Sequence, residues 1–230
     1  MSQIILSPSI LAADAANLQR DVTAVEAAGV EYLHIDIMDG HFVPNLSYSA
    51  SVVKALRPHS KLVFDVHLML SDPDKFIDEF AEAGADIITV HREAVDDLSE
   101  TISHIKSHGI KAGVSIKPGT PVDVLNDYLD KADMFLLMTV EPGFGGQSYM
   151  HQVDKKITEL RKKLDEFGLS ADIEVDGGIT ADNIDCPVRA GANVIVSGSA
   201  IFKSEDISLT VTKMREKAEQ GVLKREINHL

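Results

Sequence analysis

The chain has 230 residues, with 22 Lys and Arg against 36 Asp and Glu, which gives a formal net charge of −14. Hydrophobic residues make up 44% of it, enough for one sizeable core, and the length lies in the usual range of a single α/β barrel. Such an acidic surface repels nucleic acid and anionic membranes, so neither is expected as a partner. Cys186 is the one cysteine, and no basic leader precedes a long apolar stretch. We therefore expect a soluble, cytoplasmic protein without an internal disulfide.

Short apolar, β-branched runs recur along the chain, and each is typical of a buried strand. The predicted strands are Ile4–Ile10, Tyr32–Met38, Leu62–Met69, Asp86–His91, Ala112–Ile116, Met134–Val140, Asp172–Asp176 and Asn193–Gly198. Helix signals lie between them, such as Asp72-Pro73 and Thr120-Pro121, which predict an N-cap followed by proline at the first helical position. This alternation predicts one (β/α)₈ TIM barrel over residues 1–230. An open doubly wound sheet is the alternative, although eight units in this length close more naturally.

In such a barrel the functional side chains lie at the carboxyl ends of the strands, and alternate residues of a strand face the same way. The ends of the second, third, sixth and seventh predicted strands carry His34, Asp36 and Met38; Asp65, His67 and Met69; Met138; and Glu174 and Asp176. Two imidazoles and two carboxylates suit a divalent metal such as zinc, iron, manganese or cobalt. A hydrogen-bonded His–Asp pair in the core is the simpler reading of His34 and Asp36 alone.

Several neighbouring residues are open to two interpretations. Asp65 and Glu174 lie one step deeper and could support the site or fill the barrel core. His91, at the end of the fourth strand, is a weaker candidate ligand, whereas Asp39 is expected in a turn before Gly40. The three methionines could be core packing or an unreactive lining around an electron-rich intermediate. The histidines expected at the surface are His59, His104, His108, His151 and His229.

Glycine-rich segments follow the last three predicted strands. They are Glu141-Pro-Gly-Phe-Gly-Gly-Gln-Ser148, Asp176-Gly-Gly178 and Ser197-Gly-Ser-Ala200. Glycines at these positions let backbone N–H groups approach an anion closely, and the loops after the seventh and eighth strands are the usual phosphate site of such barrels. The first segment, with its proline and three glycines, is also typical of a lid.

With these residues assembled, the chain resembles the ribulose-phosphate 3-epimerase family over nearly its whole length. The most specific matching motifs are His34-Ile-Asp-Ile-Met-Asp-Gly-His-Phe-Val-Pro-Asn45, His67-Leu-Met69, Met138-Thr-Val-Glu-Pro-Gly-Phe-Gly-Gly-Gln147 and Glu174-Val-Asp-Gly-Gly-Ile179. Val66, Ser49 and Lys117 depart from the residues common in the family, and none of them is at a ligand position.

The resemblance implies the roles of individual residues. It implies one divalent metal ion held by His34, Asp36, His67 and Asp176, with Zn²⁺ favoured over Fe²⁺, Mn²⁺ or Co²⁺, and no organic cofactor. It implies that Asp36 and Asp176 are also the catalytic acid/base pair. The residues implied to contact the substrate are Ser9, His67, Gly143, Phe144, Gly145, Gly146, Asp176, Gly177, Gly178, Gly198 and Ser199, with Met38, Met69 and Met138 lining the intermediate.

Inverting a carbon next to a carbonyl requires proton removal on one face and return on the other, which two carboxylates across a barrel mouth can do. The resemblance thus implies a metal-dependent 3-epimerase that interconverts D-ribulose 5-phosphate and D-xylulose 5-phosphate through an enediolate. The alternatives are an allulose-6-phosphate 3-epimerase of the same family and a non-catalytic sugar-phosphate sensor. The expected partner is a small sugar phosphate, and self-association is left open.

Overall fold

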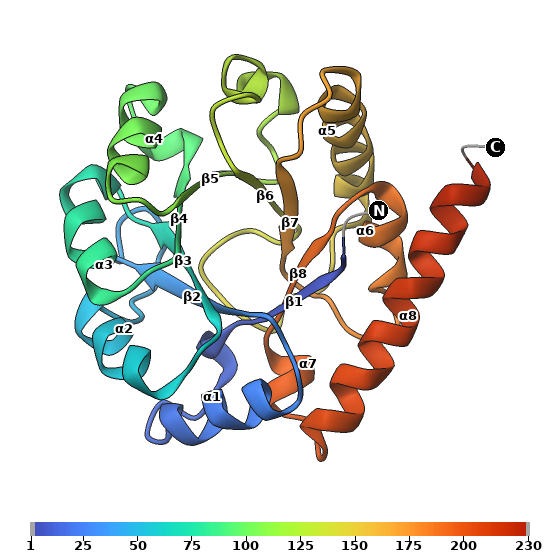
Figure 1. Ribbon diagram of the computed structural model, residues 1–230, viewed down its shortest axis with the longest axis horizontal. Coiled ribbons are helices and arrows are strands. Elements are labelled where there is room, and N and C mark those ends of the chain that lie inside the picture. The colour runs from blue at the N-terminus through green and yellow to red at the C-terminus, as the bar shows by residue number, and fades with distance from the viewer. Residues whose placement is uncertain (1–2, 229–230) are drawn as a thin grey trace.

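Eight parallel strands lie side by side in one sheet in the order β1-β8-β7-β6-β5-β4-β3-β2, in a computed structural model that describes residues 3–228. The strands are β1 (Ile5–Pro8), β2 (Tyr32–Met38), β3 (Val63–Met69), β4 (Ile87–His91), β5 (Lys111–Ile116), β6 (Met134–Met138), β7 (Asp172–Asp176) and β8 (Val194–Ser197). The sheet curls into a ring with the helices outside it (Figure 1). This confirms the predicted (β/α)₈ barrel and excludes the open sheet.

The ring closes between β1 and β2. Regular parallel ladders join every other neighbouring pair, including β1 with β8 through Ile5 and Val194. Between β1 and β2 the structure has a single parallel bridge, from Ser9 to His34. The closing seam is therefore next to two residues of the predicted site.

The helices surround the barrel and bury their apolar faces against it (Figure 1). The α-helices are α1 (Leu18–Ala27), α2 (Ala50–Leu56), α3 (Ile77–Ala83), α4 (Leu98–Ser107), α5 (Asp154–Glu166), α6 (Asp185–Ala190), α7 (Ser199–Phe202) and α8 (Ile207–Asn228). The 3₁₀ helices are η1 (Ile10–Ala12), η2 (Arg57–His59), η3 (Pro73–Phe76), η4 (Arg92–Ala94), η5 (Val122–Tyr128) and η6 (His151–Val153). No helix among residues 3–228 is long and apolar enough to cross a membrane.

Two predicted helix starts differ in detail from the structure. Asp72 precedes η3 but makes no capping hydrogen bond, and α3 begins only at Ile77. Thr120 does not cap η5, because Pro121 is the residue before that helix and the Thr120 hydroxyl instead donates to Glu93. Pro73 is the first residue of η3 as predicted, whereas Pro121 lies one residue before η5. A competing tertiary partner for the polar side chain, such as Glu93 for Thr120, cannot be predicted from a dipeptide.

The inside of the barrel is layered because alternate residues of each strand face it. At one end Tyr32, Ile87, Met134 and Val194 form a small apolar cluster. The residues two positions further along are largely polar, and those fully buried are Ser7, His34, Asp65, Thr89, Ser115 and Glu174. In place of the aliphatic layers usual in such barrels, this one has a polar centre beneath its mouth.

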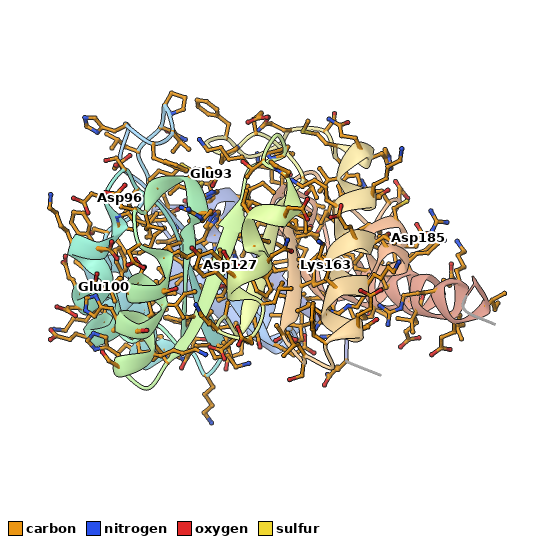
Figure 2. The ribbon with its side chains drawn as sticks, turned by 90° about the horizontal axis from the view of Figure 1, so that it is seen from above. Glu93, Asp96, Glu100, Asp127, Lys163 and Asp185 are labelled. Atoms are coloured by element: carbon orange, nitrogen blue, oxygen red, sulfur yellow. The ribbon has the colours of Figure 1, made fainter. Side chains whose placement is uncertain are left out.

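The loops that follow the strands gather at one end of the barrel, and Glu93 and Asp96 lie toward that end in the side view (Figure 2). The outer helices carry charged residues such as Lys163 and Asp185 away from the mouth (Figure 2). The polar interior therefore opens toward the loops, where the pocket described next is found.

Candidate active site

A pocket of about 200 Å³ lies at the mouth of the barrel and brings together nearly all of the predicted site residues. The predicted residues that line it are Ser9, Asp36, Met38, Met69, Met138, Gly143, Phe144, Gly145, Gly146, Asp176, Gly177, Gly178, Gly198 and Ser199. His34 and His67 are fully buried and lie behind its wall, against Asp36. The pocket also contains loop residues that were not predicted as site residues, including Leu11, Ala12 and Thr180. These three belong to no polar or glycine pattern of their own. Gln147, near the end of the predicted glycine-rich segment, lines the pocket as well.

The four residues proposed as metal ligands converge at the floor of this pocket. One ligand atom from each of His34, Asp36, His67 and Asp176 lies within 4.8 Å of the others. Nε2 of His34 is 3.3 Å from Oδ1 of Asp36 and 3.9 Å from Oδ2 of Asp176. Nδ1 of His67 is 3.2 Å from the same Asp36 oxygen. Tetrahedral ligands on bonds of about 2.1 Å are about 3.4 Å apart, so the spacing fits a small divalent ion.

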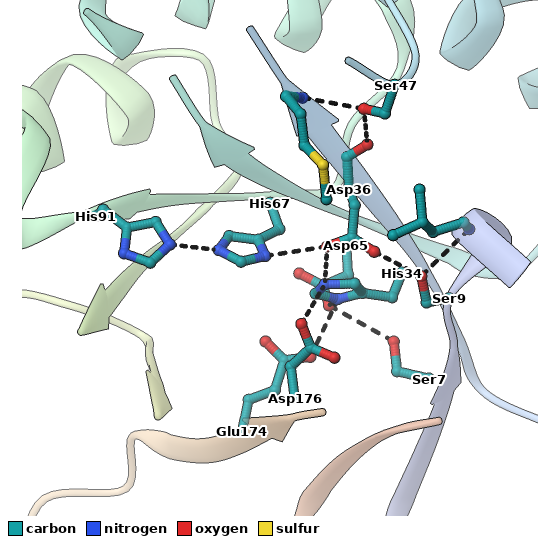
Figure 3. Close-up of polar contacts among 12 residues, drawn as sticks. Ser7, Ser9, His34, Asp36, Ser47, Asp65, His67, His91, Glu174 and Asp176 are labelled. Carbon is teal, nitrogen blue, oxygen red and sulfur yellow. Dashed lines mark hydrogen bonds and ion pairs between the residues drawn. The ribbon is translucent and has the colours of Figure 1, made fainter. Parts of the chain in front are cut away.

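The bonding of His34 points to the same conclusion. Its Nδ1 is 2.7 Å from Oδ2 of Asp65, whereas its Nε2 is buried and has no hydrogen-bond partner. A buried polar atom without a partner is costly, so the lone pair of Nε2 is available to a ligand. With Nδ1–H donated to Asp65, the free nitrogen is the one that faces Asp36 and Asp176 (Figure 3).

The electrostatics of the cluster favour a positive charge within it. Burial alone would lower the pKa of His34, but the charges of Asp36 and Asp65 outweigh burial and raise it well above its ordinary value. Burial opposes ionisation of Asp36, yet His34 and His67 lower the pKa of that carboxyl. A proton or a metal cation at this point would neutralise the same excess of negative charge.

Asp176 behaves differently from Asp36. Burial, followed by the charge of Asp36, raises the pKa of Asp176 to about 6. Asp36 is in turn oriented by Ser9, whose hydroxyl donates to Oδ2 at 2.5 Å (Figure 3). The two carboxylates thus reach one pocket from β2 and β7 with pKa values displaced in opposite directions, an arrangement typical of an acid/base pair.

Deeper in the barrel, Asp65 and Glu174 lie beneath the cluster. Burial and the charge of Asp65 raise the pKa of Glu174 well above its ordinary value, whereas His34 lowers the pKa of Asp65 against the effect of burial. These shifts favour the charged form of Asp65 next to His34 and the neutral form of Glu174. Of the two interpretations left open by the sequence, Asp65 supports His34 directly, and Glu174 faces His34 with Oε1 at 3.5 Å from Nδ1.

His91 is not part of the metal-ligand cluster among the described residues. It lies behind His67, with the two Nε2 atoms 2.9 Å apart. The sequence predicted His91 at the end of a strand, and β4 ends at this residue. It could not show that His67 lies between His91 and the other proposed ligands, because that depends on tertiary structure.

Ser47 was missed at the sequence level. Its hydroxyl donates to the carbonyl oxygen of Asp36 at 2.6 Å and accepts from the backbone N–H of Met38 at 2.9 Å (Figure 3). It therefore fixes the end of β2 on both sides of Ile37. A serine in a loop has no distinguishing sequence pattern, so the role of Ser47 is seen only in the folded structure.

The three methionines line the pocket and also pack. Met38 and Met69 form an apolar cluster with Val43, and Met138 packs with Leu136 and Val140. All three are at most 5% exposed. The methionines therefore pack in apolar clusters and also line the pocket. Their contact with a reaction intermediate stays a prediction.

The other predicted positions fall as follows. Asp39 lies in the turn after β2, where its carboxylate accepts from the N–H groups of His41, Phe42 and Ser71. The surface histidines are exposed or half-exposed, namely His59, His104, His108 and His151. His229 lies outside the described residues.

The model of the family described as "Ribulose-phosphate 3 epimerase family" matches residues 5–202. The chain belongs to the ribulose-phosphate 3-epimerase family. It is 46% identical over 211 residues to ribulose-phosphate 3-epimerase of Bacillus subtilis, covering 91% of this chain and 97% of that protein. It is 48% identical over 207 residues to the chloroplastic ribulose-5-phosphate-3-epimerase of Arabidopsis thaliana, covering 89% and 74%. The protein is therefore an epimerase whose substrate is a sugar phosphate.

Solved structures with low sequence identity share the fold. The crystal structure of KGPDC from Streptococcus mutans matches with a TM-score of 0.69 at 13% identity, covering 96% of this chain and 100% of that one. At this identity the likeness shows the barrel alone. The function of this chain therefore follows from the family match.

Proposed function

We propose that this epimerase interconverts D-ribulose 5-phosphate and D-xylulose 5-phosphate by proton transfer between two carboxylates, Asp36 and Asp176, at a divalent metal centre. The observation that carries the proposal is the meeting of these carboxylates, from β2 and β7, beside the unpartnered Nε2 of His34. Strands β2 and β7 are separated by β1 and β8 around the ring, so the two side chains approach the pocket from different sides.

The two carboxylates can exchange roles with the direction of the reaction. In one direction Asp36, whose pKa is lowered, removes the C3 proton as the base, while Asp176, whose pKa is raised to about 6, returns a proton to the other face. In the reverse direction the roles are reversed. Ser9 holds Oδ2 of Asp36 and so fixes the direction of that carboxylate toward the substrate.

His34, Asp36, His67 and Asp176 are the residues that would hold the metal, with Zn²⁺ proposed first and Fe²⁺, Mn²⁺ or Co²⁺ as alternatives. When bound, the metal supplies Lewis-acid stabilisation of the negative charge that develops on the substrate oxygens. His67 is fully buried behind the pocket wall, and its Nδ1 lies beside Oδ1 of Asp36, another proposed ligand, so we assign it to the metal rather than to direct contact with the sugar.

The glycine segments are proposed to hold the phosphate. Gly177, Gly178, Gly198 and Ser199 line one side of the pocket, and Gly143–Gly146 line another. Gly198 precedes the short helix α7 at the end of β8, the position at which such barrels commonly bind phosphate. Anchoring the phosphate away from the reacting carbon lets its binding energy place C3 between the carboxylates.

Metal dependence is tested by removing and restoring the ion. Strong chelation of the purified protein should abolish turnover of D-ribulose 5-phosphate, and added Zn²⁺, Fe²⁺, Mn²⁺ or Co²⁺ should restore it. Full turnover in protein shown by elemental analysis to be metal-free would disprove the metal centre. Faster turnover of D-allulose 6-phosphate than of the pentose would reassign the substrate.

The two-carboxylate mechanism is tested with Asp36→Asn and Asp176→Asn, with Asp182→Asn in the loop after β7 as the matched control. Each of the first two should lower kcat by at least about 10²-fold, the usual contribution of general acid–base catalysis. In deuterated water the native enzyme should place solvent deuterium at C3 of the product. Efficient transfer of the substrate's own C3 hydrogen to product would show that a single base acts instead.

A further inference from the structure

A line of hydrogen bonds leaves the active site through His67 and ends in the loops after β4 and β5. Nδ1 of His67 lies 3.2 Å from Oδ1 of Asp36, and its Nε2 lies 2.9 Å from Nε2 of His91. Nδ1 of His91 in turn lies 3.3 Å from Oε2 of Glu93. Figure 3 shows Asp36, His67 and His91 in this line. Both histidines are fully buried, and they stack with their ring centroids 5.0 Å apart.

Only one assignment of protons satisfies this line when a metal is bound. The nitrogen of His67 that faces the other ligands is Nδ1, so Nδ1 must offer a lone pair and Nε2 must carry the proton. Nε2 of His91 must then accept a hydrogen bond from the Nε2–H of His67. The hydrogen of the neutral His91 ring is therefore on Nδ1. That hydrogen points at the Glu93 carboxylate, which can only accept.

Glu93, at the far end of the line, is held in place as a hydrogen-bond acceptor. Oε1 of Glu93 accepts from the backbone N–H of Lys117 at 2.8 Å and from the hydroxyl of Thr120 at 2.5 Å. A backbone N–H can only donate, so the group at this position must present an oxygen to Lys117. The Glu93 side chain is 23% exposed, at the loop end of the barrel (Figure 2).

The middle of the line is shielded from water. The ring of Phe42 packs over His91 with centroids 4.7 Å apart, and the Lys117 ammonium lies 4.0 Å from the centre of that same ring. His91 itself is therefore fully buried, and its two polar partners are His67 and Glu93. The second metal-site histidine, His34, has a simpler support, since Asp65 contacts its Nδ1 directly.

We propose that His91 and Glu93 are positioning residues, which hold His67 in the tautomer that presents Nδ1 to the metal. The proposal rests on the metal centre of the proposed function and adds two residues that contact neither metal nor substrate. Partners of this kind orient metal-binding histidines in many proteins, and their loss commonly weakens metal binding about 10- to 100-fold.

Glu93→Gln is the sharpest test because it keeps the size of the side chain. The Lys117 N–H holds the amide oxygen of glutamine, so the amide NH₂ turns toward Nδ1 of His91. His91 must then carry its hydrogen on Nε2, opposite the hydrogen of His67, and the line is broken. We expect Glu93→Gln to bind Zn²⁺ and Co²⁺ about 10-fold or more weakly in competition with a chromophoric chelator. Glu100→Gln, which changes a carboxylate on α4, should bind both metals like the native protein.

A second variant and a spectroscopic readout guard against an effect on folding alone. His91→Phe removes the acceptor but keeps an aromatic ring in the space, and it should weaken metal binding while the metal-free protein still unfolds cooperatively. In ¹⁵N-labelled native protein with Zn²⁺, long-range ¹H–¹⁵N spectra should show His67 protonated at Nε2. Native-like metal affinity in both Glu93→Gln and His91→Phe would overturn the positioning role. Failure of the native protein to bind metal would instead overturn the metal centre itself.

Discussion

The side-chain amide of Asn45 donates a hydrogen bond to the carbonyl oxygen of Gly143 at 2.9 Å, and so ties the loop after β2 to the glycine-rich loop after β6. Val43 packs in the same place, since a Cβ on Gly143 would lie 3.2 Å from the Cβ of Val43. The predicted lid therefore has a fixed point at its start. Phe144, the next residue, is 54% exposed and Gly145 has open space around it.

Removing this fixed point should weaken substrate binding more than chemistry. We expect Asn45→Ala to raise KM several-fold with a smaller change in kcat, because a net hydrogen bond of about 1 kcal/mol holds the loop over the pocket. Steady-state kinetics on D-ribulose 5-phosphate measure this. Asn126→Ala, in η5, is the control, and equal KM values in the two variants would argue against the tie.

Gly198 and Gly178 should respond differently to aspartate, although both line the proposed phosphate site. A Cβ on Gly198 meets nothing closer than the Cβ of Ala12 at 3.2 Å, so Gly198→Asp should fold and raise KM by charge repulsion with the phosphate. A Cβ on Gly178 would lie 2.3 Å from the backbone nitrogen of Tyr149, and its φ is +70°. Gly178→Asp should therefore lose stability as well as binding.

Thermal unfolding together with KM separates these two effects. The midpoint of thermal unfolding should fall for Gly178→Asp, because of the contact with Tyr149, and should change little for Gly198→Asp. Gly198→Ala is the control for Gly198→Asp, because it adds the Cβ without the charge. An unchanged KM in Gly198→Asp would place the phosphate elsewhere in the pocket.

Asp65 and Glu174 are both buried carboxyl groups, yet amide substitution should cost much less stability at Glu174 than at Asp65. Burial and the charge of Asp65 raise the pKa of Glu174 and favour its neutral form, so Glu174→Gln should change the unfolding free energy of the metal-free protein by less than about 1 kcal/mol. Asp65→Asn removes the charge beside Nδ1 of His34 and should cost on the order of 3 kcal/mol. Urea unfolding measures both, and an equal loss in the two variants would contradict the assigned charges.

Asp39 should make stability depend on pH at the acidic end. Burial would raise its pKa, but hydrogen bonds from Ser71, His41 and Phe42 lower it to about 2 from the ordinary value of 3.8. A folded-state pKa below the unfolded one means that the stabilisation is complete above pH 3.8 and is lost as the pH falls toward 2.

The matched comparison is Asp39→Asn, which cannot titrate. The stability advantage of the native chain over this variant should be constant near neutral pH and should shrink below pH 3.8. Urea unfolding at several pH values measures it, with Asp96→Asn as the surface control. An advantage that does not change with pH across this acidic range would show that Asp39 acts through its shape rather than its charge.

Strand parity was enough to predict that the proposed ligands on β2 and β3 lie together. His34 and Asp36 face the same way because they are two residues apart on β2, and the register pairs Asp36 with His67 on β3. Strand order around a closed barrel then brings Asp176 near them. These relations depend on periodicity and on parallel pairing, both of which a sequence displays.

Hydrogen bonds made by loop side chains could not be predicted from the sequence. Glu93 accepts from Lys117 and Thr120, which are on a different loop, and Ser47 reaches back to the end of β2. Side chains of this kind have no fixed spacing from the groups they contact. For the same reason β1 proved shorter than predicted: it ends at Pro8, and Ser9 instead begins η1 by accepting from the N–H of Leu11.

The seam between β1 and β2 has a consequence for the order of events during synthesis. Of the eight barrel strands β1 is made first, but its regular ladder is with β8, which is made last of the eight. Until then its link to β2 is the bridge from Ser9 to His34, together with the Ser9–Asp36 hydrogen bond. Gly198, immediately after β8, packs against Ser9. The growing chain therefore completes its barrel and the proposed phosphate end of its pocket in one step, after the other seven strands have been translated.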